Sequence, residues 1–237
     1  MSGVLIVFAT ALSACGFDDS LYFGWDDRRV ICARSIDDSE RSVDVPGLLQ
    51  RMDDAITYRQ VYNLYSHVPG MTVSYDLIDQ VLDGAVARQL SFVTYGDMLD
   101  ASDPRGGLAL AFDDQSVDAW FTLRDTLRRH GARVTFFVTR YLQLPDQARA
   151  ELRELAADGH DIEAHGVDHL DAVKYVAAHG MEAYLRDEAL PSVDALVADG
   201  YPASVFAYPF GSHDEDIDRA LLDHVALVRT TAGPCPW

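Results

Sequence analysis

Two adjacent aspartates, Asp113 and Asp114, follow an apolar stretch that runs from Leu108 to Phe112. Neighbouring side chains on a strand point to opposite faces, so both carboxylates can serve one site only where the strand gives way to a loop. Parallel α/β folds build their active sites at these carboxyl ends of strands. We therefore expect Asp114 to bind a metal ion and Asp113 to remain free to act as a base.

The stretch HGVDH at residues 165–169 follows another strand-like segment and contains two histidines four positions apart. His165 and His169 can chelate one ion where a helix or a tight turn aligns their rings. With Asp114 they form a set of two nitrogens and one carboxylate oxygen, typical of catalytic sites that keep a position open for water. Zinc in such a site lowers the pKa of its water from about 15.7 to about 7 and polarises a carbonyl. The set predicts metal-assisted attack on an acyl group, whereas an HxxxH pair alone would fit two unrelated surface histidines.

A third stretch, FAYPFG at residues 206–211, has the form of a strand that ends at a proline and turns sharply at a glycine. The functional interpretation is that the backbone N–H of Phe210 faces the oxyanion that develops during the reaction. The alternative is a plain corner between a strand and a loop.

Strand-like and helix-like stretches alternate about seven times along the chain. The strand-like stretches cover residues 30–36, 61–68, 92–95, 108–112, 134–138, 162–165, 205–210 and 226–229. Helical spacing of apolar residues covers residues 46–56, 74–86, 116–131, 147–157, two runs between 172 and 198, and 216–224. This α/β alternation predicts a parallel sheet, most simply closed as a (β/α) barrel of about seven strands. Residues 18–27 are polar and aromatic, which predicts a loop.

The composition limits the size and the partners of the protein. The chain has 237 residues, of which 49% are hydrophobic, so it suits one domain with a large core. A formal charge of -19 argues against nucleic acid or an anionic membrane surface as a partner. The acidic surface is either a solvated face or an attraction for cationic, amine-bearing glycans.

The N-terminus resembles a bacterial lipoprotein signal. Its apolar run is too short to span a bilayer and ends in small residues just before Cys15. We expect residues 1–15 to be a signal peptide that ends at a lipidated Cys15, and residues 16–237 to form one domain. The protein would then be exported and would touch the cell membrane or outer membrane only through its lipid. The alternative is a buried N-terminal strand or helix. Cys32 and Cys235 would remain as a disulfide or as two buried thiols.

Together, AFDD at residues 111–114, HGVDH and YPFG at residues 208–211 resemble the first three motifs of the polysaccharide deacetylases, the carbohydrate esterase family 4 or NodB-homology group. The resemblance runs from about residue 61 to residue 229. It implies a distorted (β/α) barrel that removes acetyl groups from N- or O-acetylated glycans with a divalent metal, usually zinc. It also implies that Asp113 is the general base, that Asp114, His165 and His169 are the metal ligands, and that Phe210 and Tyr208 face the oxyanion or the substrate.

The general acid of most family members is a histidine in a late Leu-x-x-His motif. His224 fits the letters, but it lies in a predicted helix close behind the third motif. The sequence LYSH at residues 64–67 ends a strand and is the better candidate, because a closed barrel allows circular permutation of its strands. The resulting order is similar to that of deacetylases of biofilm poly-N-acetylglucosamine. We therefore expect His67 to be the general acid; the alternative is a locally bonded strand histidine.

The chain also departs from the family pattern. Gln115 replaces a usual glycine, Gly166 replaces a serine or threonine, and no arginine precedes Pro209 in the third motif. A fourth motif, an aspartate near a tryptophan, has no clear counterpart, and Asp37 is the best candidate. We predict a metal-dependent hydrolase that removes acetyl groups from an N-acetylated polysaccharide at the cell envelope. The alternatives are an inactive glycan-binding lipoprotein on the same barrel and a metal-dependent O-acetyl esterase.

Overall fold

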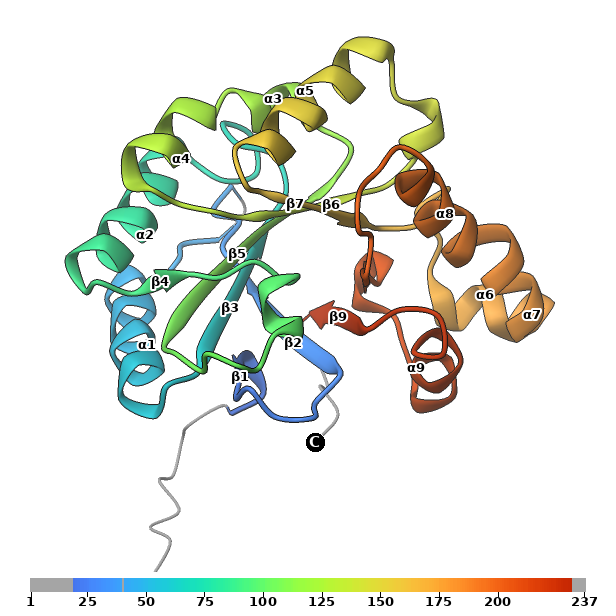
Figure 1. Ribbon diagram of the computed structural model, residues 1–237, viewed down its shortest axis with the longest axis horizontal. Coiled ribbons are helices and arrows are strands. Elements are labelled where there is room, and N and C mark those ends of the chain that lie inside the picture. The colour runs from blue at the N-terminus through green and yellow to red at the C-terminus, as the bar shows by residue number, and fades with distance from the viewer. Residues whose placement is uncertain (1–18, 40, 232–237) are drawn as a thin grey trace, which may run out of the picture.

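The computed structural model describes residues 19–39 and 41–231. Seven parallel strands close into a barrel in the order β2-β9-β8-β7-β6-β5-β3, with β3 paired again to β2 (Figure 1). The strands are β2 (Val30–Ser35), β3 (Val61–Ser66), β5 (Gly107–Asp114), β6 (Thr135–Val138), β7 (Asp161–Ala164), β8 (Val205–Ala207) and β9 (Leu227–Thr231). The predicted α/β barrel of about seven strands is therefore confirmed.

Two short strands extend this barrel at the amino-terminal ends of its strands. β1 (Tyr22–Phe23) pairs antiparallel with the start of β3, and β4 (Ser91–Phe92) pairs parallel with the start of β5. The loop predicted over residues 18–27 is therefore wrong at β1, which follows a turn of 3-10 helix, η1 (Asp19–Leu21). Both residues of β1 are buried, and Tyr22 stacks on Tyr62 with ring centroids 5.3 Å apart. Aromatic burial, rather than alternation along a long strand, forms this element.

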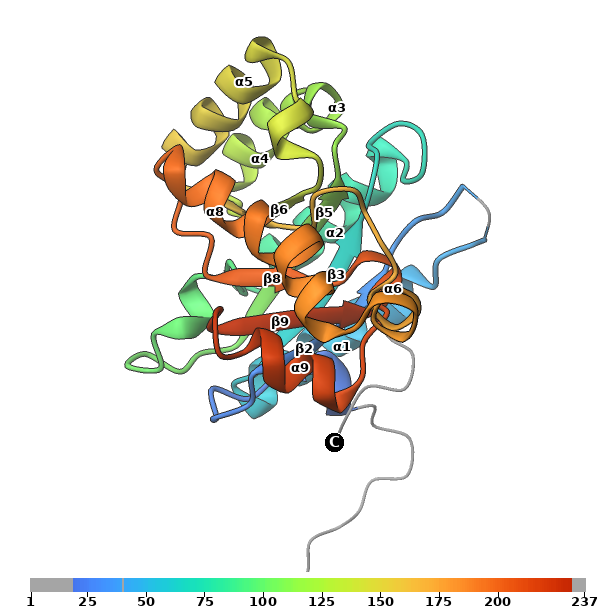
Figure 2. The same cartoon turned by 90° about the vertical axis from the view of Figure 1, so that its right-hand side faces the viewer.

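Helices surround the barrel (Figures 1 and 2). They are α1 (Val45–Tyr58), α2 (Tyr75–Ala87), α3 (Val117–Phe121), α4 (Arg124–His130), α5 (Asp146–Ala157), α6 (Ala172–His179), α7 (Met181–Tyr184), α8 (Leu190–Ala198) and α9 (Glu215–Leu221). Short turns lie between them at η2 (Asp97–Leu99), η3 (Tyr141–Gln143), the π-helical η4 (Leu185–Ala189) and η5 (Pro209–Gly211). Ser74 caps α2, since its side chain accepts a hydrogen bond from Leu77 N.

The core has one layer inside the barrel and another between the barrel and the helices. On β5, Leu108, Leu110 and Phe112 pack in the outer layer, whereas Ala109 and Ala111 pack in the inner one. The alternation continues to the next residue and turns Asp113 inward. Small residues on the inner face leave room there for larger functional side chains.

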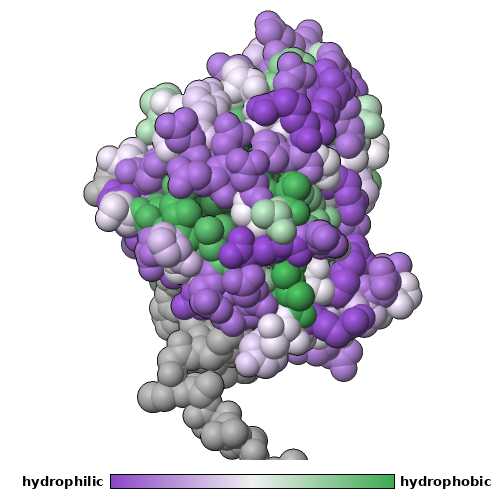
Figure 3. Space-filling model, turned by 90° about the vertical axis from the view of Figure 1, so that its left-hand side faces the viewer, coloured by the Kyte–Doolittle hydropathy of each residue, from purple (hydrophilic) through white to green (hydrophobic). Residues whose placement is uncertain are grey.

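The face that carries α1, α2 and β4 is mostly hydrophilic, with separate smaller hydrophobic areas (Figure 3). Within residues 19–39 and 41–231, no helix combines the length and the apolarity needed to cross a membrane. Cys32 on β2 is buried and disulfide-bonded. Residues 1–15 with Cys15, and also Cys235, lie outside the described residues, so the signal peptide, the lipidation and the pairing of Cys32 with Cys235 stay predictions.

Candidate active site

The three predicted metal ligands meet at the carboxyl ends of β5 and β7. The ligand atoms of Asp114, His165 and His169 all lie within 4.8 Å of one another. Asp114 Oδ1 is 3.6 Å from His165 Nε2 and 3.1 Å from His169 Nε2. Burial alone would raise the pKa of Asp114, but its interactions with the two neighbouring histidines lower it, so the carboxylate is ionised. The cluster offers a divalent metal two nitrogens and one oxygen.

Unusual backbone conformations bring these side chains together. Asp114 has a φ of 88°, so the chain leaves the regular strand geometry at this residue and both aspartates can reach one site. Gly166 has a φ of 86°, which glycine adopts without strain, and His169 has a φ of 62°. The tight turn between the two histidines depends on these left-handed residues.

Hydrogen bonds fix the first ligand histidine and the loops beside it. His165 Nδ1 lies 2.8 Å from Ala207 O, and because a carbonyl can only accept, Nδ1 carries the proton and Nε2 faces Asp114 with its lone pair. Thr139 N donates to Asp114 O at 2.8 Å, and Thr139 Oγ1 donates to Gly166 O at 3.1 Å. The loops after β5, β6 and β7 are thereby joined.

A buried carboxylate supports the loop between the two histidines. Glu188 in η4 accepts hydrogen bonds from Asp168 N and Leu170 N, both at 2.8 Å. A side-chain carbon at Gly166 would come within 2.2 Å of Glu188 Oε1. The glycine found where the family has serine or threonine therefore makes room for this carboxylate. No pattern in the sequence marks Glu188, which follows Arg186 and Asp187 in a helical run.

The expected base is paired with an arginine that the sequence analysis missed. Arg229 on β9 is fully buried, and its Nη2 donates to Asp113 Oδ2 at 2.5 Å. Its guanidinium carbon lies 5.0 Å from the ring centroids of both Tyr65 and Phe137, which line the barrel interior. The arginine missing from the third motif is thus supplied by another strand. An arginine within the apolar run ALVRT was the available signal.

The expected acid forms a dyad with Asp37. His67 follows β3, and its Nδ1 lies 2.6 Å from Asp37 Oδ2. Ser66 Oγ and His67 N both donate to the other oxygen of Asp37, at 2.7 Å and 3.3 Å, and Trp120 Nε1 donates to His67 O at 2.8 Å. Asp37, the candidate for the fourth motif, therefore lies where it can orient His67 and leave Nε2 free to face the site.

The dyad shifts both pKa values. Burial alone would lower the pKa of His67, but the hydrogen bond that it donates to Asp37 and the charges of Asp113, Asp37 and Asp114 raise it above its ordinary value. Burial would raise the pKa of Asp37, but hydrogen bonds from His67, Ser66 and Thr72 lower it. The geometry favours a protonated histidine beside an ionised aspartate. His224, the other histidine considered for this role, is exposed just after α9.

The third motif only partly meets expectation. Phe210 lies at the rim with a φ of 60°, and its ring centroid is 4.6 Å from that of His169. Tyr208 is fully buried in the outer core, and its N–H donates to Arg229 O. This corrects the expectation that the Tyr208 side chain faces the substrate. Strand alternation is the reason, because Ala207 points inward and Tyr208 therefore points outward.

Comparison with known families identifies the fold and its motifs. The family model for polysaccharide deacetylases matches residues 100–225, which include the ligand cluster and Asp113. The chain belongs to the polysaccharide deacetylase family. A site of two histidines and an aspartate, with a second aspartate beside it, agrees with that family's role as carbohydrate deacetylases, and its members are metalloenzymes.

Solved structures with the same fold include several deacetylases. The chain is similar to PplD, a deacetylase of Streptococcus pyogenes, with 16% identity, a TM-score of 0.56, and coverage of 73% of this chain and 92% of that one. It is also similar to the BpsB deacetylase domain of Bordetella bronchiseptica, with 14% identity, a TM-score of 0.51, and coverage of 90% and 97%. A de-N-acetylase of Aggregatibacter actinomycetemcomitans gives 14% identity, a TM-score of 0.56, and coverage of 83% and 84%.

One curated protein also matches part of this chain. A gellan lyase of a Bacillus species is 34% identical over 135 residues, which are 56% of this chain. The match spans only 5% of that protein's length.

Proposed function

We propose that this deacetylase is a metal-dependent hydrolase that removes acetyl groups from an N-acetylated polysaccharide at the cell envelope. The observation that carries the proposal is the meeting, in one barrel mouth, of a three-ligand cluster with a base and an acid that each have a hydrogen-bonded partner. Arg229 holds Asp113, and Asp37 holds His67. The order of the strands, with His67 ahead of Asp113, supports a circularly permuted member of the family. Export and lipid anchoring through Cys15 complete the proposal.

The residues present fit a divalent metal. Asp114 Oδ1 is buried without a hydrogen-bond partner among the described residues, and it lies between the Nε2 atoms of His165 and His169. We propose zinc as the ion, because it favours nitrogen and oxygen ligands and three-ligand sites. A metal held there would supply Lewis-acid polarisation of the acetyl carbonyl and activation of the attacking water.

Asp113 has one oxygen held and the other available. Oδ2 accepts the hydrogen bond from Arg229, while Oδ1 is buried with no hydrogen-bond partner in the part of the chain that the structure describes. Oδ1 is therefore the atom that would accept the proton of the attacking water. The fixed carboxylate need not reorganise as the charge moves.

His67 is arranged to complete the reaction. Its Nδ1 is bound to Asp37, so Nε2 would donate a proton to the departing amine as the bond from acetyl carbon to nitrogen breaks. The products would be acetate and a free amine on the glycan. Phe210, beside His169 at the rim, is placed to contact the acetyl group, and its backbone N–H remains the candidate donor to the oxyanion.

The test is acetate release by the purified protein reconstituted with zinc or cobalt. N-acetylglucosamine oligomers and peptidoglycan offer N-acetyl groups, whereas acetylated xylan offers O-acetyl groups, so comparing them distinguishes the two activities. Each substrate should be assayed at low and at high salt. We expect metal-dependent release that falls by about 10²- to 10⁴-fold in His67→Ala. His224→Ala is the matched control and should behave as the parent. Absence of release from every substrate, with the metal bound and the protein folded, would favour a glycan-binding protein instead.

A further inference from the structure

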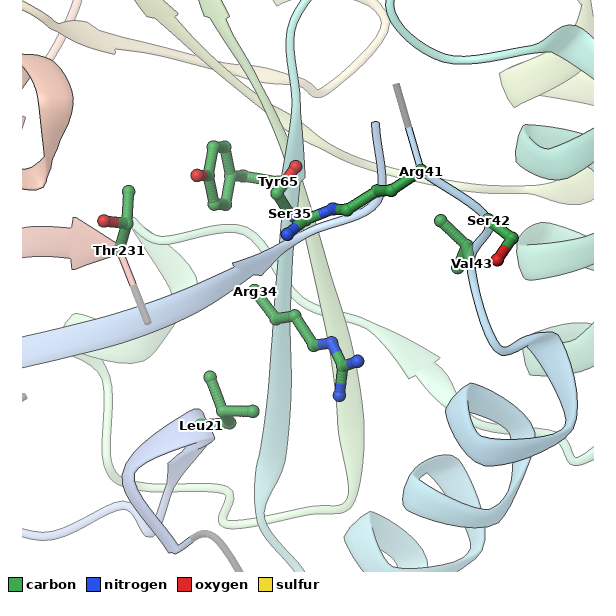
Figure 4. A pocket seen from close by; sticks show the side chains of 8 residues that line it. All are labelled: Leu21, Arg34, Ser35, Arg41, Ser42, Val43, Tyr65 and Thr231. Carbon is green, nitrogen blue, oxygen red and sulfur yellow. The ribbon is translucent and has the colours of Figure 1, made fainter. Parts of the chain in front are cut away.

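A polar cavity lies beside the acid dyad and is not used by the proposed chemistry. It has a volume of about 440 Å³ and is lined by Arg34, Arg41, Tyr65 and Thr231 among others (Figure 4). Figure 4 shows Arg41 reaching back towards Ser35 and Tyr65 at the end of β2, and Arg34 extending from that strand. A volume of this size suits part of a carbohydrate chain.

The cavity adjoins the acid dyad, because it shares lining residues with a second cavity that includes Asp37. Ser35, Arg41 and Tyr65 also line a second cavity of about 300 Å³ that includes Asp37. Ser35 Oγ donates to Asp37 Oδ2 at 3.0 Å, and the Tyr65 ring lies 5.6 Å from the His67 ring between centroids. A group bound by the arginines would thus belong to the same glycan whose amine receives the proton from His67.

The two arginines of this cavity have no carboxylate partner among the described residues. Nine of the eighteen arginines form ion pairs with carboxylates within the described residues. Arg34 and Arg41 form no such pair with any residue in 19–39 or 41–231, and both are exposed. These two arginines line one cavity, and no acidic residue is among the described residues that line it.

We propose that this cavity is a subsite for the carboxylate of an acidic sugar, so that the substrate is an anionic N-acetylated glycan. The inference rests on the proposed function and names its substrate class. The planar guanidinium group matches a carboxylate through paired hydrogen bonds. The net charge of -19 does not prevent this binding, because salt screens charges beyond about 8 Å at physiological ionic strength and the charged residues that line this cavity, among those described, are the two arginines.

Binding of two tetrasaccharides of equal length tests the proposal. Hyaluronan tetrasaccharide carries N-acetyl groups and carboxylates, whereas the N-acetylglucosamine tetramer carries only N-acetyl groups. Calorimetry would be done on Asp113→Asn protein, so that neither ligand is consumed, at about 50 and 500 mM salt. We expect hyaluronan to bind about tenfold more tightly at low salt, and this preference to shrink at high salt.

Variants locate the effect. In the same background, Arg34→Gln with Arg41→Gln should weaken hyaluronan binding about tenfold or more and leave the neutral tetramer unchanged. Arg129→Gln with Arg219→Gln, which removes two positive charges at exposed positions of α4 and α9, is the control and should change neither. Equal binding of the two ligands, undetectable hyaluronan binding, or hyaluronan binding unaffected by the double substitution would overturn the subsite. Since this assay needs no turnover, arginine-dependent binding in this background, together with no acetate release by the parent protein, would contradict the proposed function and leave the subsite standing.

Discussion

The metal-ligand half and the acid–base half of the site are assembled from different parts of the chain. Asp114, His165 and His169 come from β5 and the loop after β7, and each lies in a short motif. The acid–base half depends on pairs that are distant in sequence, since Asp113 and Arg229 are 116 residues apart and His67 and Asp37 are 30 apart. Closure of the barrel, with β2 joined to both β3 and β9, brings these pairs together.

The largest loss of stability and activity should follow substitution of Arg229, because its pair with Asp113 is the longest-range contact of the site. Arg229→Met leaves Asp113 buried without its partner, and breaking a buried ion pair in this way costs about 3–5 kcal/mol of unfolding free energy. We also expect kcat for acetate release to fall about 10²-fold, because the base is no longer held in place, while metal content stays that of the parent. Denaturant unfolding, metal analysis and steady-state kinetics measure the three quantities.

Arg229→Lys is the informative companion variant. It keeps the charge but loses the planar group that lies beside Tyr65 and Phe137. Most of the stability should return, with kcat still below that of the parent. If Arg229→Met, confirmed as folded, kept the parent's kcat, Arg229 would be a structural residue without influence on the base.

The next effect concerns the metal half alone. Glu188→Gln replaces one of the two accepting carboxylate oxygens by an NH₂ group, which cannot accept a hydrogen bond. Either Asp168 N or Leu170 N therefore loses its acceptor. The loop that places His169 should loosen, and the affinity for zinc should fall about 10- to 100-fold. Competition with a chelating dye measures this affinity. An affinity equal to the parent's would mean that the loop is held by its other hydrogen bonds.

The smallest effect should be a shift in pH dependence. Asp37→Asn keeps an acceptor for His67 Nδ1 but removes a negative charge that raises the pKa of His67. His67 must be protonated to donate, so activity is present below its pKa and is lost as the pH rises through it. The basic limb of kcat/KM should therefore move to lower pH in the variant, with less than about a tenfold loss on the acid side. An unmoved basic limb would show that another group sets it.

The sequence predicted the parts of this molecule that depend on local patterns. Alternating strands and helices gave the barrel, and AFDD with HGVDH gave the ligand cluster, since both patterns are short. Arg229 was missed because a single charge in an apolar strand does not reveal which strand it will face across a closed barrel. Glu188 was missed because its partners, Asp168 N and Leu170 N, are 20 and 18 residues away and no local pattern marks the contact. Tyr208 was misplaced because strand alternation, which turns Ala207 inward, turns the next side chain into the outer core.

The account's central claim is that metal binding and acid–base chemistry belong to different residues of the site. Metal content and acetate release, measured on the same preparations of two variants, test this claim most directly. Asp113→Asn should retain the metal content of the parent while acetate release falls by about 10²- to 10⁴-fold, because the base is lost and the ligands remain. His165→Ala should lose both the metal and the activity. Near-parental turnover by Asp113→Asn, or full metal content in His165→Ala, would contradict the account.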